Sequence, residues 1–329
     1  MKRSSLTTTG VMLATTALLA AACSGQVGDA GGDDSASIDS KNLTLITGTQ
    51  NEPFYISLRC GAEAAAQEAG YELGTQEPAK FDPTLQTEKV NALIGDPPAA
   101  LLIAPTDDKA MKAPIQQVKN AGSKIIEVDT ALADQSVAES SISSDNTEGG
   151  RLAAQTLADL VGDKSGSVLV LDTIAGTSTT NERAAGFEEE LKNYPNLKSI
   201  GIQFTQNEPA EAASKVTAAV AAHPDLVGIF ATNLNAGEGA ATGLRNVRKI
   251  GQVNLVGFDA SPSEVEGLRK GEFQALIAQD PAAIGRQGVE QAIAAIEGNP
   301  VERAITADLH ALTQDNMDAN EQYFYKQRC

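Results

Sequence analysis

The feature of this sequence that most constrains its fold is a regular alternation of short apolar runs with longer amphipathic stretches. The alternation starts near residue 43 and repeats roughly every 25 to 30 residues, which predicts a parallel sheet whose strands are connected by helices. The apolar runs consist almost entirely of aliphatic and β-branched residues, which indicates strands that are buried on both faces. We therefore predict an α/β fold in which helices cover the sheet in front and behind.

The predicted elements follow one another in strict order along the chain. The strands are expected at residues 43–47, 99–104, 124–128, 167–171, 199–204, 226–231, 253–258 and 275–278. The helices are expected at residues 55–69, 83–94, 109–121, 148–161, 182–192, 209–222, 236–248, 262–270 and 282–297. Glycines directly follow four of these helices, where a left-handed residue is commonly needed, so we assign them to helix termination. These glycines are Gly70, Gly122, Gly271 and Gly298.

The first 41 residues predict where the protein works. A positive start, Met1-Lys2-Arg3, precedes an apolar run at 11–22 and small residues just before Cys23, as in a secretory signal that ends in a lipobox. Ala20 stands where such boxes usually carry leucine. The apolar run is shorter than the roughly 20 residues that span a bilayer. We expect a signal peptide at residues 1–22 and a lipid on Cys23 that holds the protein to the outer face of the cell membrane; plain secretion is the alternative.

Length and composition limit what the rest of the chain can form and bind. Residues 23–41 are rich in Gly, Ser and Asp and predict a flexible tether. About 290 residues remain, more than one hydrophobic core usually serves, so we expect two lobes. Loss of Lys2 and Arg3 leaves 23 basic against 43 acidic residues. Such a surface repels nucleic acid, anionic lipid and anionic ligands, and it favours a neutral small molecule.

Two cysteines remain in a chain that is exported to an oxidising compartment. We expect Cys60 and Cys329 to form a disulfide, with free thiols as the alternative. In the chain-entropy model so long a loop contributes roughly 4 to 5 kcal/mol. Two histidines and scattered cysteines give no ligand spacing for a metal, so we expect no metal site and no cofactor.

The residues that directly follow the predicted strands are conspicuously polar. In an open parallel sheet, ligands bind beyond the carboxyl ends of the strands. Carboxylates and amides that meet there suit a polyhydroxylated ligand, because each sugar hydroxyl both donates and accepts a hydrogen bond. These strand-end residues are Thr49-Gln50-Asn51-Glu52, Asp129-Thr130, Thr232-Asn233, Asp259 and Gln279-Asp280.

Aromatic side chains stand near the same strand ends, although only 4% of the residues are aromatic. Phe54, Tyr55 and Phe258 are placed where they could offer flat faces to a sugar ring. The alternative is that Phe54 and Tyr55 only fasten their helix to the sheet.

A set of motifs resembles one family over residues 43–311. Thr49-Gln50-Asn51-Glu52-Pro53-Phe54-Tyr55, followed by Gly61-Ala62, resembles the opening of the ribose-binding cluster of periplasmic-type (type I) binding proteins, which serve bacterial ABC importers. Each motif alone is weak, but all of them fall in family order. The others are Ala104-Pro105-Thr106-Asp107, Val128-Asp129, Ser144-Asp145-Asn146, Ala175-Gly176-Thr177-Ser178, Glu182-Arg183, Phe230-Ala231-Thr232-Asn233, Gly257-Phe258-Asp259 and Ile277-Ala278-Gln279-Asp280-Pro281.

The resemblance implies two similar α/β lobes, each a parallel sheet with helices on both faces, joined by a three-strand hinge. Lobe one would comprise residues 42–144 and 280–308, and lobe two residues 145–279 and 309–329. A bond between Cys60 and Cys329 would then fasten the tail of lobe two to lobe one. We expect it near the hinge axis, where it is compatible with closure.

The resemblance also implies a ligand set. Asp129, Arg183, Asn233, Asp259 and Gln279 match polar residues that hold the sugar in this family, and Phe54, Tyr55 and Phe258 match its stacking platforms. The carboxylates would accept charge-assisted hydrogen bonds from hydroxyl groups. Surface pairing of Arg183, and loop capping by Asp129, Asn233 and Asp259, are the alternatives.

Three departures from the family pattern bear on selectivity. Glu52 stands where ribose binders usually place asparagine, Thr130 where they place arginine, and Asn207 where they tend to carry a stacking aromatic. The loss of an arginine and an aromatic, with a gain of polar groups, favours a hexose, a polyol or a pentose other than ribose.

The function that follows is solute capture for transport. Two lobes would close on a neutral sugar or polyol, and the permease subunits of an ABC transporter would recognise the closed form. We expect a monomer that binds no nucleic acid. An enzyme is not expected, because the chain lacks Gly-x-Ser-x-Gly and a phosphate-binding glycine loop, and His223 and His310 follow no predicted strand. The alternative is a binding protein that presents a sugar-like autoinducer to a membrane sensor.

Overall fold

A computed structural model describes residues 41–329 of the chain. The predicted signal peptide, the lipidation of Cys23 and all but the last residue of the predicted tether lie outside the described residues.

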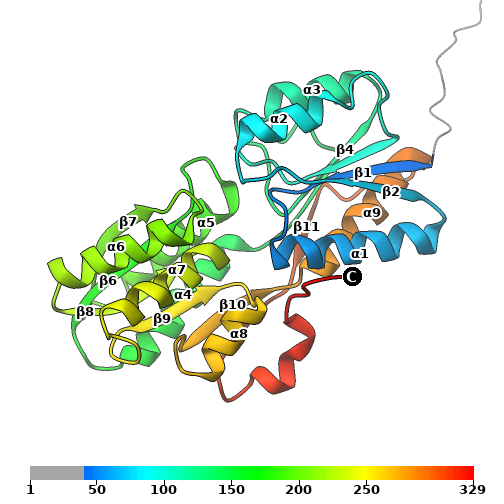
Figure 1. The fold of residues 1–329 in the computed structure, drawn as a ribbon. Coiled ribbons are helices and arrows are strands. Elements are labelled where there is room, and N and C mark those ends of the chain that lie inside the picture. The colour runs from blue at the N-terminus through cyan, green and yellow to red at the C-terminus, as the bar shows by residue number, and fades with distance from the viewer. Residues whose placement is uncertain (1–40) are drawn as a thin grey trace, which may run out of the picture. The chain divides into compact units, whose positions relative to one another are not determined.

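The strands of the described chain form two six-stranded sheets (Figure 1). The first sheet contains β1 (Asn42–Ile46), β2 (Glu72–Gln76), β3 (Ala100–Ile103), β4 (Lys124–Val128), β5 (Ser140–Ser144) and β11 (Ala304–Ala307). The second contains β6 (Gly166–Asp172), β7 (Leu197–Phe204), β8 (Leu226–Ala231), β9 (Asn254–Phe258), β10 (Ala275–Gln279) and β12 (Leu309–Leu312).

Both sheets have the same doubly wound strand order. The first sheet runs β11-β5-β4-β3-β1-β2 with parallel pairs throughout. The second runs β12-β10-β9-β8-β6-β7, and β12 is antiparallel to β10 while the other pairs are parallel. The carboxyl ends of the parallel strands therefore meet at one edge of each sheet.

Helices cover both faces of each sheet (Figure 1). The helices are α1 (Pro53–Ala69), α2 (Pro83–Asn91), α3 (Lys112–Asn120), α4 (Asn146–Val161), α5 (Ser178–Leu191), α6 (Pro209–Ala222), α7 (Leu234–Asn246), α8 (Pro262–Arg269) and α9 (Pro281–Glu297). Helices α1 and α9 lie on one side of the first sheet, and α2 and α3 lie on the other. On the second sheet, α4 and α5 cover one face, and α6, α7 and α8 cover the other.

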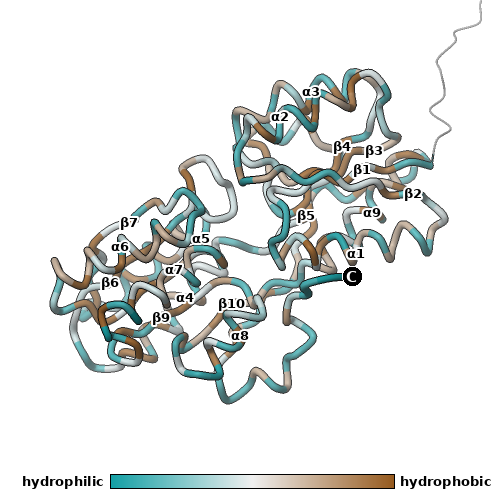
Figure 2. Tube along the Cα trace, in the orientation of Figure 1, coloured by the Kyte–Doolittle hydropathy of each residue, from teal (hydrophilic) through white to brown (hydrophobic). Residues whose placement is uncertain are grey.

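Alternate residues of the central strands belong to different hydrophobic clusters. Leu102 of β3 packs in the cluster that includes Leu58 of α1, whereas Leu101 of the same strand packs in the cluster that includes Ile115 of α3. All four residues of β3 are buried, and the strand is among the most hydrophobic segments in Figure 2. The predicted burial on both faces is confirmed for the central strands. It is wrong for the strand predicted at 199–204, because β7 lies at the edge of its sheet and is largely exposed.

The chain changes sheets three times. It leaves the first sheet after β5, returns after β10, and leaves again between β11 and β12. The predicted fold, two parallel-sheet α/β lobes joined by three crossing segments, is confirmed. The residue boundaries proposed for the lobes stay a prediction.

All eight predicted strands and all nine predicted helices are present within residues 41–329, with ends that shift by a few residues. The sequence analysis missed four further strands, β2, β5, β11 and β12, and the 3₁₀ helix at Met317–Tyr323. These strands are short and polar or lie at a sheet edge; β5, for example, reads Ser-Ser-Ile-Ser-Ser. Such strands lack the continuous apolar run on which the prediction relied.

The structure joins Cys60 of α1 to Cys329, the last residue of the chain, in a disulfide. A helix with the length and apolar character needed to cross a membrane is not found within residues 41–329.

Candidate functional site

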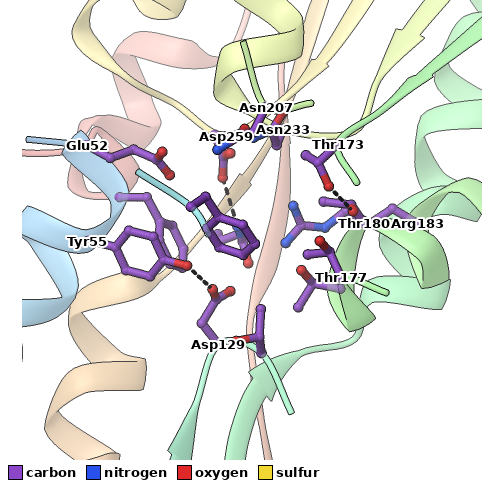
Figure 3. A pocket seen from close by; sticks show the side chains of 15 residues that line it. Glu52, Tyr55, Asp129, Thr173, Thr177, Thr180, Arg183, Asn207, Asn233 and Asp259 are labelled. Carbon is purple, nitrogen blue, oxygen red and sulfur yellow. Dashed lines mark hydrogen bonds between the residues drawn. The ribbon is translucent and has the colours of Figure 1, made fainter. Parts of the chain in front are cut away.

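The candidate site is a cavity with an empty volume of about 380 Å³ at the carboxyl ends of strands from both sheets (Figure 3). All predicted ligand-binding residues except Phe258 line it. The lining comprises Glu52, Phe54, Tyr55, Phe81, Asp129, Thr130, Thr173, Thr177, Thr179, Thr180, Arg183, Asn207, Asn233, Asp259 and Gln279.

Asp129 directly follows β4 and is held by a tyrosine of α1. Its backbone adopts a left-handed conformation, with φ of 69°, and its amide donates to the carbonyl of Ile142 at 2.8 Å. The Tyr55 hydroxyl donates to Oδ2 of Asp129 at 2.9 Å, as Figure 3 shows. Burial raises the pKa of Asp129 to about 6, although the charge of Arg183 and the Tyr55 hydroxyl act in the opposite direction.

Asp259 occupies the corresponding position after β9 in the second sheet. Its φ is 95°, and its amide donates to the carbonyl of Ile277 at 2.8 Å. Its Oδ1 accepts from the side-chain amide of Gln279 at 2.8 Å and from the Tyr325 hydroxyl at 2.9 Å. Its Oδ2 accepts from the Leu234 backbone amide at 3.0 Å. These three donors fix the orientation of the carboxylate.

Arg183 of α5 brings a positive charge to the cavity, and its residue is only 2% exposed. Its Nε donates to the side-chain oxygen of Asn146, and its Nη1 donates to the carbonyl of Thr232, both at 2.9 Å. Its Nη2 has no hydrogen-bond partner among the described residues. In Figure 3 the guanidinium points into the cavity, so this nitrogen can donate to a ligand.

The stacking position predicted for Phe258 is wrong. Phe258 is fully buried and does not line the cavity. The Arg183 guanidinium lies over its ring, 3.7 Å from the centroid, which is a favourable cation–π contact. Phe258 is the last residue of β9 and supports Arg183 from the core, whereas Asp259 lies beyond the strand end and points to the cavity.

Phe54 and Tyr55 both line the cavity and both pack within α1. Their rings meet edge to face at 5.2 Å, and the Phe54 ring also meets Tyr325 at 5.8 Å. Each residue is 3% exposed. The two roles considered for them, contact with a ligand and attachment of the helix, are therefore compatible.

Glu52 and Asn207 belong to one amide network. Asn233 and Asn235 donate to the Asn207 side-chain oxygen at 2.8 and 3.1 Å, and Asn235 also donates to Glu52 at 3.3 Å. Figure 3 shows the Glu52 carboxyl directed into the cavity. Burial, together with the charges of Asp259 and Asp129, raises the pKa of Glu52 to about 8. Glu52 is therefore largely protonated at neutral pH and can donate a hydrogen bond.

Threonine hydroxyls supply further polar groups to the cavity wall. Those of Thr173 and Thr180 are bonded to each other at 2.7 Å. Those of Thr130 and Thr177 are buried without a hydrogen-bond partner in the part of the chain that the structure describes. A group of three His, Cys, Asp or Glu side chains suited to a metal ion is not present among residues 41–329.

Comparison with known proteins assigns the chain to one family. Residues 43–300 match the family model described as a periplasmic binding protein domain. The chain belongs to the periplasmic binding protein family.

This periplasmic binding protein has curated and structural relatives that align over most of its length. It is 31% identical to the ribose import binding protein of Escherichia coli (strain K12), over 81% of this chain and 88% of the relative. It is 35% identical to an ABC transporter solute-binding protein from Agrobacterium vitis bound with alpha-D-tagatopyranose, with a TM-score of 0.84 over 87% and 99% of the two chains. A carbohydrate transporter solute-binding protein from Agrobacterium radiobacter in complex with D-arabinose is 26% identical, with a TM-score of 0.82 over 87% and 98%.

Several lining residues of this binding protein were missed by the sequence analysis. Phe81 follows β2, a strand that was itself not predicted. Thr173 follows β6, so the rule that strand ends carry the site would have found it. Thr177, Thr179 and Thr180 lie at the start of α5, within or next to a motif that carried the resemblance, but no hydrophobic pattern distinguishes their orientation.

Proposed function

We propose that this chain is the extracytoplasmic solute-binding protein of an ABC importer and that it captures a neutral sugar or polyol. The observation that carries the proposal is the mixture of fixed acceptors and unpartnered donors in one cavity. A sugar hydroxyl needs both kinds of partner, because it donates one hydrogen bond and accepts others.

The proposed ligand contacts follow from the site geometry. Asp129 and Asp259 accept hydrogen bonds from sugar hydroxyls, and the charge on the acceptor strengthens these bonds. Arg183 donates through Nη2, and Thr130 and Thr177 through their free hydroxyls. The edges and faces of Phe54 and Tyr55 contact the apolar side of the ring. The amide network around Asn207 and Asn233, together with Glu52 and Gln279, completes the polar wall.

We propose a narrower class of ligand for this chain than the range of sugars bound by its relatives. The relatives include a ribose import binding protein and solute-binding proteins bound with alpha-D-tagatopyranose and with D-arabinose. Glu52, Thr130 and Asn207 all line the cavity, and they are the positions at which this chain departs from the ribose-binding pattern. We therefore propose a hexose, a polyol or a pentose other than ribose.

Contacts across the cavity support a closing mechanism. Asn235, which follows β8, donates to Glu52, which follows β1. The Asp108 amide donates to the carbonyl of Gly176 at 3.0 Å, and the Ala131 amide donates to the Ser178 hydroxyl at 3.0 Å. A ligand that contacts both sheets stabilises the arrangement in which these bonds form, and it shifts the population by its differential affinity for that arrangement. Permease subunits would recognise the closed form.

We further propose that the mature protein is a monomer without catalytic activity, anchored by a lipid on Cys23. The support for the anchor is the signal-like pattern in residues 1–23. Replacement of Cys23 by serine in the expressing cell should release the protein from the membrane fraction. Retention of Cys23→Ser on the membrane would contradict the anchor.

A thermal-shift screen tests the proposed function. The mature chain is heated with aldopentoses, aldohexoses, ketoses, polyols, inositols and a few amino acids. A ligand at about 100 times its dissociation constant stabilises the folded state by roughly 2.7 kcal/mol, so the melting temperature should rise by roughly 5 °C or more. A selective response to one sugar or polyol supports the proposal. A response to amino acids alone, or to none of these compounds, overturns it.

A further inference from the structure

We propose that Tyr325 is a positioning residue of the ligand site and that the Cys60–Cys329 disulfide holds the terminal segment that carries it. This inference rests on the proposed function, because it concerns the same cavity. Tyr325 does not line the cavity, and it acts through Asp259 and Gln279, which do.

The contacts of the Tyr325 hydroxyl carry the inference. The hydroxyl donates to Oδ1 of Asp259 at 2.9 Å and accepts from the backbone amide of Gln279 at 3.2 Å. The residue is 4% exposed, so water does not substitute for these bonds. One hydroxyl therefore links the strand-end residues of β9 and β10.

In both sheets a tyrosine hydroxyl holds a strand-end aspartate, but the two tyrosines come from different parts of the chain. Each carries an aspartate at a strand end in a left-handed conformation, with φ of 69° at Asp129 and 95° at Asp259. Each aspartate accepts a hydrogen bond from a buried tyrosine at 2.9 Å. A left-handed conformation is rare outside glycine and persists where the surroundings hold it. For Asp129 the tyrosine comes from α1, and for Asp259 it comes from the end of the chain.

Two backbone amides attach Tyr325 and the next residue to the rest of the protein. The Tyr325 amide donates to the carbonyl of Ala260 at 2.9 Å, and the Lys326 amide donates to the Ser57 hydroxyl at 2.7 Å. The residues from Lys326 to Cys329 are exposed and teal in Figure 2, so burial of apolar surface does not hold them.

The disulfide supplies the missing attachment. Cys60 lies on α1, one turn beyond Ser57 and on the helix that carries Phe54 and Tyr55. The bond therefore keeps Tyr325 against both Phe54 and Asp259. It follows that ligand affinity depends on the redox state of the two cysteines.

Hydrogen exchange of one backbone amide tests the positioning role without a ligand. The Leu234 amide donates to Oδ2 of Asp259 and does not contact Tyr325. In Tyr325→Phe this amide should exchange faster, because the carboxylate loses one of its three donors. Tyr323→Phe is the matched control, since Tyr323 stacks on His310 in the same terminal segment. Unchanged exchange at Leu234 in Tyr325→Phe overturns the positioning role.

Ligand titration gives the second readout. D-Tagatose, D-arabinose, D-ribose, D-fucose and xylitol are titrated into the wild-type chain, Tyr325→Phe and the disulfide-free Cys60→Ser/Cys329→Ser. The variants should bind the tightest of these probes roughly tenfold more weakly than the wild type, because a hydrogen bond to a charged group is lost or loosened. The relative affinities for the probes should also change, which simple destabilisation would not cause.

The outcomes separate the inference from the proposed function. If the wild type binds none of the probes, the sugar proposal fails for these ligands, while exchange at Leu234 still decides whether Tyr325 positions Asp259. If exchange and affinity change in Tyr325→Phe but not in the disulfide-free variant, the role of the disulfide is overturned. A wild-type response in both variants overturns the whole inference.

Discussion

At the scale of single residues, the site depends on two aspartates whose backbones are left-handed. An ordinary extended strand sends successive side chains to opposite faces of the sheet. The left-handed turn at Asp129 and Asp259 redirects each carboxylate toward the cavity instead. Aspartate tolerates this conformation better than most side chains do. Tyrosine hydroxyls then fix both carboxylates, so the acceptors are oriented before a ligand arrives.

The first prediction concerns Asp129. Asp129→Asn keeps the shape of the side chain but replaces a charged acceptor with a neutral amide, so ligand hydroxyls lose charge-assisted bonds. Affinity for the ligand found in the thermal-shift screen should fall by roughly 10- to 100-fold. Isothermal titration calorimetry measures this change. The exposed Asp96→Asn is the control and should bind like the wild type, and equal affinities in all three proteins would contradict the site.

A second prediction concerns the pH dependence of stability. Burial and neighbouring negative charges raise the folded-state pKa of Glu52 to about 8. In the unfolded state Glu52 has the ordinary glutamate pKa and loses its proton at a lower pH than in the folded state. The folded state therefore binds more protons between these two pKa values, so the free energy of unfolding falls as the pH rises toward 8. Without ligand, the melting temperature should increase by roughly a few degrees between about pH 8 and about pH 6.

Glu52→Gln isolates this contribution. Glutamine cannot ionise, so the variant should show a smaller increase in melting temperature over the same pH interval. Part of the increase should remain, because burial also raises the pKa of Glu127 to about 7. The exposed Glu88→Gln serves as the control. An identical pH response in Glu52→Gln and the wild type would refute the assignment.

The strand-end residues of the site could be predicted from the sequence, because ligands bind beyond the carboxyl ends of parallel strands. No comparable rule predicts where a side chain in a helix or in the last segment of the chain points. Asp129 and Asp259 directly follow apolar runs, Asn233 follows one after a single threonine, and the order of the strands brings the three residues together. Phe258 lies one residue before Asp259, and only the tertiary structure shows that it packs under Arg183. Tyr325 contacts Asp259 across 66 residues of sequence, and no local pattern predicts such a contact.

At the scale of elements, the close packing of α1 against α9 places the start of α1 at the site. The carbonyl oxygens of α1 and α9 approach Gly285 and Gly61 so closely that a Cβ at either glycine would overlap the other helix. Helices meet at such short range only where one side lacks a side chain. The sequence analysis predicted both helices but not this contact, because glycine within a helix has several explanations.

A third prediction follows for Gly285. In Gly285→Ala the new Cβ would overlap the carbonyl oxygen of Leu58, so α9 must shift away from α1. Overpacking of this kind costs about 1 to 3 kcal/mol of the free energy of unfolding. Urea denaturation measures the cost. Gly95→Ala is the matched control, because nothing lies within 4 Å of its added Cβ and stability should change by less than about 0.5 kcal/mol. Equal stability of the two variants would contradict the close packing.

Short polar strands mark the limit of prediction at this scale. β5 contains four serines, and β11 and β12 have four residues each. β11 and β12 lie at sheet edges and β5 lies next to β11, and none of the three buries a continuous apolar run. β5 and β12 nevertheless flank two of the segments by which the chain changes sheets. The strands that were hardest to predict therefore adjoin the segments about which the two lobes would close.

At the scale of the whole molecule, an exposed ion pair links the two sides of the cavity. Lys80 Nζ lies 2.7 Å from Glu208 Oε1, and the two residues lie beyond β2 of the first sheet and before α6 of the second. Both also line the wider outer hollow that adjoins the ligand cavity. Exposed pairs contribute little to stability, but a pair that forms only when the two sides approach favours the closed arrangement.

The last prediction therefore concerns charge reversal at this pair. In Lys80→Glu, two acidic side chains face each other, so closure is opposed and ligand affinity should fall by roughly twofold to fivefold at about 20 mM salt. The loss should shrink at about 500 mM salt, where exposed charges are screened. The double reversal Lys80→Glu/Glu208→Lys restores attraction with the signs exchanged, and it should recover most of the affinity. A loss that persists in the double variant or at high salt would mean that Lys80 acts locally, not through closure of the cavity.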